Sequence, residues 1–79
     1  MEDRKFEAIL TILVPQVVQL ICENHHVDEI TATRDFHESG VYSLLEKEEN
    51  KVWHFSPHTL FVMYDEERRT GTFTLPEET

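Results

Sequence analysis

Apolar side chains recur at steps of three and four residues through the N-terminal part of the chain. They begin at Phe6 and end at Ile21, with polar side chains between them. This period collects the apolar set on one face of an α-helix. The stripe consists of Phe6, Ile9, Leu10, Leu13, Val14, Val17, Leu20 and Ile21. The pattern predicts an amphipathic helix that starts at an N-cap at Asp3 and ends near Asn24.

Pro15 lies in the middle of this predicted helix. Proline has no amide proton, so the helix loses the hydrogen bond to the carbonyl of Thr11 and should bend there or split into two pieces. Because the apolar phase continues unbroken across Pro15, we expect one kinked helix.

Two shorter helices are expected next. Asp28 can cap a helix that runs to about Glu38, and Ser39-Gly40 then interrupts the chain. Val41, Tyr42, Leu44 and Leu45 are apolar and are followed by four charged residues, which predicts a third helix closed by Asn50.

The segment 41–55 has a second interpretation. Val41 to Leu45 and Val52 to Phe55 could pair as the strands of a hairpin across a polar turn. Leucine and glutamate are strong helix formers, so we favour the helix.

The fourth helix carries the clearest start and stop signals. Ser56 is a good N-cap, Pro57 suits the first helical position, and Gly71 can end the helix after Arg69. The expected buried side consists of Leu60, Phe61, Met63 and Tyr64.

The chain then alternates polar and apolar residues before Pro76. This alternation predicts an extended tail that places Phe73 and Leu75 on the core. The sequence therefore predicts one all-α domain, residues 1–79, of about four helices and an extended C-terminal tail. The alternative is an α+β fold with a hairpin at 41–55.

Charge and composition narrow the function classes. The chain has 79 residues and a formal charge of −9, which repels phosphate backbones and argues against direct nucleic-acid binding. A basic protein partner would suit the same charge, and a domain this small could gain buried area as a homodimer. The N-terminus has acids where a signal peptide has bases, and we expect no apolar run to approach the roughly 20 residues that a membrane span needs. We expect a cytoplasmic protein with no membrane association.

Several short motifs form a familiar set. They are the run from Tyr42 to Glu48, the Lys51–His54 step, the Ser56-Pro57 cap, and the stretch from Asp65 to Thr72. Together they resemble a group of very short, acidic bacterial proteins classed as a domain of unknown function. The resemblance implies a small helical domain. Because some relatives of such proteins are thought to lie beside toxin-like genes, it also suggests an antitoxin or regulatory role.

No residue pattern points to catalysis or to a metal. The five histidines do not form a helical H-x-x-x-H pair, because the cap at Ser56-Pro57 separates His54 from His58. The single cysteine, Cys22, flanks the apolar stripe and is expected to be a core residue. Nucleophile motifs and phosphate-binding glycine loops are absent from the sequence. We therefore predict no catalytic, cofactor-binding or metal-binding residue, no cofactor, and no enzyme activity.

Trp53, flanked by His54 and Phe55, precedes the fourth helix. It can join the third and fourth helices as a core residue. Alternatively, Trp53, Phe55 and Phe61 lie partly on the surface and anchor a protein partner, because aromatic side chains dominate interface hot spots. The favoured function is a non-enzymatic interaction or regulatory module. A metal-dependent sensor and a small enzyme acting at an oligomer interface are the alternatives.

Overall fold

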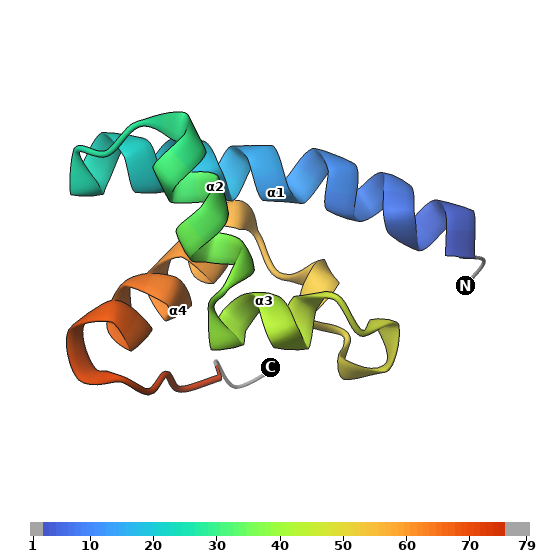
Figure 1. Ribbon diagram of the computed structural model, residues 1–79. Helices are drawn as coiled ribbons and strands as arrows, with labels where there is room; N and C mark the ends of the chain where they lie inside the picture. Colours follow the sequence, from blue (N-terminus) through green and yellow to red (C-terminus); the bar gives the residue numbers. More distant parts are fainter. Residues whose placement is uncertain (1–2, 76–79) are drawn as a thin grey trace.

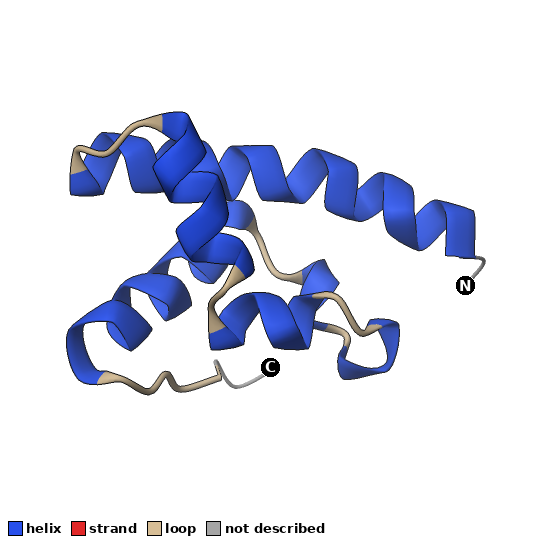
Figure 2. Ribbon diagram, viewed as in Figure 1, coloured by secondary structure: helices blue, strands red, loops and turns tan. Residues whose placement is uncertain are grey.

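The computed structural model describes residues 3–75, apart from the side chains of Asp3 and Glu48. Within this range the regular elements are four α-helices and two 3₁₀ turns, and no strand occurs between residues 3 and 75 (Figure 2). The protein is a small all-α domain, as predicted, and the hairpin alternative at 41–55 is wrong. Both of its proposed strands are helical: one lies in an α-helix and the other in a 3₁₀ turn.

Helix α1, Asp3–His25, is continuous through Pro15. The prediction of one helix is therefore confirmed, and the alternative of two separate pieces is wrong. Proline is tolerated because its ring lies on the exposed face of the helix. The helix starts at Asp3 itself, and the predicted capping by its carboxylate lies outside the described side chains.

Helix α2, Glu29–His37, follows a break in which His26 adopts a left-handed conformation with φ of 56°. Asp28 has the extended backbone of an N-cap, but its carboxylate forms no capping hydrogen bond of good geometry. The nearby Thr31 hydroxyl nevertheless lowers the pKa of Asp28, against the opposing effect of desolvation, and the backbone of Thr31 lowers it further. The predicted start is thus correct in position, although the cap itself is weak.

Helix α3, Gly40–Leu45, is shorter than predicted. Glu46 is its C-cap, so the helix does not continue to Asn50. Two 3₁₀ turns follow, η1 at Glu48–Asn50 and η2 at Val52–His54. The left-handed residue of this segment is Lys51, with φ of 57°, so the predicted closure at Asn50 is displaced by one residue. The side-chain amide of Asn50 instead donates to the carbonyl of Leu44.

Helix α4, Pro57–Thr70, begins and ends where the sequence predicts. The Ser56 hydroxyl accepts from the amide of Thr59 at 3.2 Å, and Gly71 stops the helix with φ of 87°. The extended tail places Phe73 against the core, but Leu75 is 50% exposed, so the prediction for Leu75 is wrong. Pro76 lies outside the described residues.

Buried side chains from all four helices form one cluster. It includes Phe36, which is fully buried and makes edge-to-face contacts with Tyr42 and Tyr64. Full burial of such a side chain contributes about 1.5–3 kcal/mol to folding. The stripe of α1 supplies one wall of the cluster with Leu13, Val17 and Ile21, and Val18, which lies outside the predicted stripe, is also buried there.

Figure 1 shows how the helices are arranged. Helix α1 runs along one side of the molecule, α2 crosses it, and α3 and α4 lie on the opposite side of the core. Helix α1 makes its main contacts with α4 and α2. The N-terminal half of α1 extends beyond its crossing with α2 (Figure 1).

Continuity through Pro15 also changes one sequence expectation. The segment Arg4–His25 is long and apolar enough to cross a membrane, judged by length and composition only. The expectation that no apolar stretch approaches this length is therefore wrong. Core helices of soluble proteins and signal sequences near an N-terminus satisfy the same criterion, and 22% of this window is buried within the fold.

Candidate functional site

The predicted aromatic anchors occupy different environments. Trp53 lies in η2 and Phe55 directly follows it; both are half-buried and pack against the core. His54, between them, contacts both rings, with centroid separations of 6.0 Å to Trp53 and 4.6 Å to Phe55. Phe61 is only 9% exposed and belongs to the core of α4, so the expectation that it lies partly on the surface is wrong. Trp53 and Phe55 therefore form the aromatic segment that remains accessible.

A groove of about 590 Å³ separates α1 from α2. Its floor is a row of side chains one helical turn apart on α1: Val14, Val18 and Cys22. The rim is more polar, with Gln19 and Glu23 on α1. The groove is within the size range of small-ligand pockets, although it is open along its length.

Cys22 belongs to this groove. It is a free thiol of intermediate burial that packs against the core cluster, in line with the prediction of a residue on the flank of the stripe. Its other side lines the groove.

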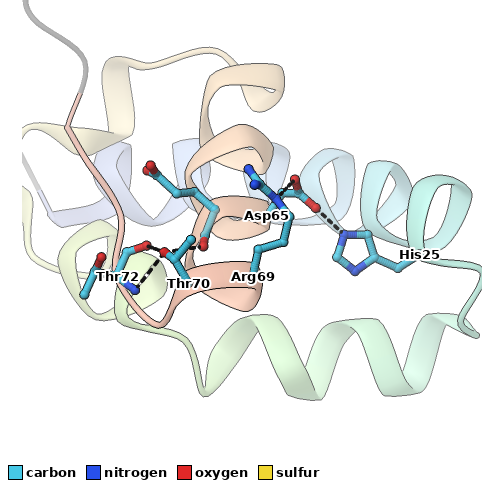
Figure 3. Close-up of polar contacts among 6 residues, drawn as sticks. His25, Asp65, Arg69, Thr70 and Thr72 are labelled. Atoms are coloured by element: carbon cyan, nitrogen blue, oxygen red, sulfur yellow. Dashed lines mark hydrogen bonds and ion pairs between the residues drawn. The ribbon is translucent and has the colours of Figure 1, made fainter.

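A polar cluster joins the end of α1 to α4 (Figure 3). The Nε2 atom of His25 donates to Oδ1 of Asp65 at 2.9 Å, and the Nε atom of Arg69 donates to Oδ2 at 3.1 Å. The hydrogen bond from His25 holds the pKa of Asp65 below its usual value; desolvation opposes it, and the hydrogen bond from Arg69 lowers the pKa further. The His25 ring also contacts Phe61 and Tyr64, at centroid distances of 5.8 and 5.9 Å. This cluster fastens the C-terminal end of α1 to α4.

A second polar cluster fastens α4 to α3. The carboxylate of Glu67 accepts from the amide of Gly40 at 2.8 Å and from the amide of Val41 at 3.2 Å. These amides are among the unsatisfied donors at the start of a helix. The buried Ser39 supplies the rest of the cap, since its hydroxyl accepts from the amide of Tyr42 and donates to the carbonyl of Phe36.

The sequence patterns predict neither cluster. The contacts that join one helix to another, His25 with Asp65 and Glu67 with the start of α3, link residues between 26 and 40 positions apart, which no local pattern reports. The only available signal was chemical: Ser39-Gly40 resembles a helix start, and a helix start attracts a carboxylate.

The geometry also bears on catalysis and metal binding. Between residues 3 and 75, no three histidine, cysteine or acidic side chains come together as a metal site would require. His25 and Asp65 form a pair of the kind used in general base catalysis, but the structural contacts of both side chains account for the pair.

Comparisons with known proteins add no relatives. Scans against protein-family models, curated proteins and solved structures found no match to this chain.

Proposed function

We propose that this chain is a non-enzymatic interaction or regulatory module of the bacterial cytosol that binds a basic protein partner. Its formal charge is −9. Such a charge attracts a positive surface, raises the rate of encounter and disfavours nucleic acid.

The observation that carries the proposal is the uncovered apolar surface of this acidic chain. Ile30 is 79% exposed and Ile12 is 60% exposed, on neighbouring helices. Trp53 and Phe55 add a second, half-buried aromatic surface. Apolar contact surrounded by negative charge suits a partner that presents apolar side chains among lysines and arginines. An antitoxin-like role is one form of this function, and it rests on the resemblance of the capping and packing motifs.

The test starts from a tagged chain that captures its partner at low salt. The partner, once identified, is purified and titrated into the chain by calorimetry. We expect a basic protein whose affinity falls by at least about tenfold between roughly 50 and 500 mM NaCl, because salt screens the attraction. An acidic partner, or binding insensitive to salt, would contradict the proposal.

The aromatic segment is tested in the same assay. Trp53→Ala, shown by circular dichroism to remain helical, should weaken binding if Trp53 is an anchor. Val62→Ala is the matched control, because it removes an exposed apolar side chain from α4. Equal affinities for both variants would remove Trp53 from the proposed interface and leave the acidic attraction intact.

A further inference from the structure

The groove between α1 and α2 has an ordered chemical layout. Along α1, Val14, Val18 and Cys22 follow one another at intervals of four residues and form its apolar floor. A parallel row, Pro15, Gln19 and Glu23, forms the outer rim. Each row passes along one side of the helix, since residues four apart lie one above the other.

The opposite rim comes from α2, which contributes Glu29 and Thr33. The chain turns from α1 into α2 between His25 and Glu29, so Glu23 and Glu29 lie at the same end of the groove, beside this connection. The groove thus changes along its length, from an apolar end at Val14 and Pro15 to an end flanked by two carboxylates.

The negative charge beside the groove favours a positively charged occupant. Both Glu23 and Glu29 are exposed, and Asp28 adds a third carboxylate at the connection between the helices. A second copy of this chain, which also carries a charge of −9, would bring negative charge against these groups. A cationic segment would gain from all three.

We infer that the groove between α1 and α2 receives a basic amphipathic helix of a protein partner. An apolar side chain of that helix lies on Val14, Val18 and Cys22, and a lysine or arginine about one turn away pairs with Glu23 and Glu29. Val18 and Glu23 are five residues apart, about 7.5 Å along the axis of α1, whereas residues i and i+4 on the partner helix are about 6 Å apart, and a long lysine or arginine side chain spans the difference. This inference rests on the proposed function and names the surface that performs it.

The probe is a synthetic peptide of about 18 residues, long enough to form a helix, with leucines on one face and lysines on the other. A peptide with glutamate in place of lysine is its matched control. Fluorescence anisotropy of the labelled lysine peptide gives its affinity for the chain and its variants. We expect binding of the lysine peptide and none of the glutamate peptide.

Two charge-matched double variants locate the binding surface. Glu23→Lys with Glu29→Lys should weaken binding of the lysine peptide by at least about tenfold, because both carboxylates flank the groove. Glu46→Lys with Glu49→Lys makes the same change of charge at exposed positions after α3 and should weaken it by no more than about threefold. Circular dichroism confirms that both variants are folded. Equal losses in the two variants would overturn the groove as the site.

Cys22 provides an independent readout, because it is the only cysteine of the chain and lies on the floor of the groove. Saturating lysine peptide should slow alkylation of Cys22 by N-ethylmaleimide at least about fivefold, as expected for a thiol that becomes covered. An unchanged rate would contradict the inference. Protection that rises with protein concentration in the absence of peptide, together with a dimer in sedimentation, would instead assign the groove to a second copy.

These outcomes separate the two proposals. If the lysine peptide binds but the groove variants behave like their controls, the groove inference fails and attraction to a basic partner stands. If the chain binds neither the lysine peptide nor any basic protein at low salt, both proposals fail.

Discussion

Glu67 caps the start of α3 although it lies 27 residues beyond Gly40 in the chain. Replacement by alanine leaves two amides at the start of α3 without their acceptor. We expect Glu67→Ala to lower the free energy of unfolding by about 1–2 kcal/mol, as measured by urea denaturation. Glu67→Gln keeps one acceptor oxygen and should lose less.

Glu49→Ala is the control for this prediction, because Glu49 is exposed on η1. Its effect should stay within about 0.5 kcal/mol. Equal effects of Glu67→Ala and Glu49→Ala would show that the contacts between α3 and α4 do not depend on the cap.

Asp65 makes stability depend on pH. Its pKa in the folded chain is lowered, first by the hydrogen bond from His25. A carboxyl of this kind stabilises the fold above its unfolded pKa, and the contribution is lost as pH falls through the folded pKa. The free energy of unfolding should therefore decrease below about pH 4.

Asp65→Asn should flatten this acid decrease. The difference should be at most about 1 kcal/mol, because the Asp65 side chain is 33% exposed and solvent screens the pair. Urea denaturation at a series of pH values measures it. Glu49→Gln, which removes a carboxylate from the exposed 3₁₀ turn, should change the acid decrease less; an equal change would contradict the assignment to Asp65.

At the scale of elements, Pro15 destabilises α1 locally, while the packing of α1 in the core stabilises the helix. Pro15 removes one hydrogen bond from the middle of the helix. Because the ring is exposed, Pro15→Ala should restore the bond to Thr11 without creating a cavity. We expect the free energy of unfolding to rise by about 1–3 kcal/mol in urea denaturation.

Gln16→Ala, at the exposed neighbouring position, should change stability by less than about 0.5 kcal/mol. A loss of stability in Pro15→Ala would show that a bend at Pro15 is needed to seat α1 against both α2 and α4. The predicted kink and the packing of α1 are thus tested together.

Local sequence signals predict the ends of α4 more accurately than the segment after α3. Ser56, Pro57 and Gly71 act within one turn of the residues they cap, and α4 begins and ends where they indicate. The segment after α3 lacks such signals, and its left-handed residue is Lys51 where Asn50 was expected. Lysine has no intrinsic preference for the left-handed conformation, so the two 3₁₀ turns on either side of Lys51 impose it.

At the scale of the whole molecule, negative charge opposes compaction. The radius of gyration is 12.1 Å, well below the screening length of about 30 Å at 10 mM salt. Every carboxylate therefore repels the others at low salt, and at about 150 mM the screening length of roughly 8 Å removes most of this repulsion.

We expect the melting temperature at pH 7 to rise by several degrees as NaCl increases from about 10 to 150 mM, followed by circular dichroism. Potassium chloride should raise the melting temperature equally, because screening depends on ionic strength and not on which monovalent cation is present. A fall in melting temperature would mean that attractive pairs such as Arg69 with Asp65 outweigh the general repulsion.

The sequence by itself determined the helical class, the stripe of α1 and both ends of α4. These features depend on periodicity and on capping groups within a few residues, which the order of amino acids states directly. Tertiary structure alone decided which flanks are covered: Phe61 is buried, Leu75 is exposed, and Cys22 lies on the floor of a groove. It also brought Glu67 to the start of α3 and His25 to Asp65. The reason is physical, since burial and long-range hydrogen bonds depend on the angles at which helices cross, and a helical period specifies a face without specifying its neighbour.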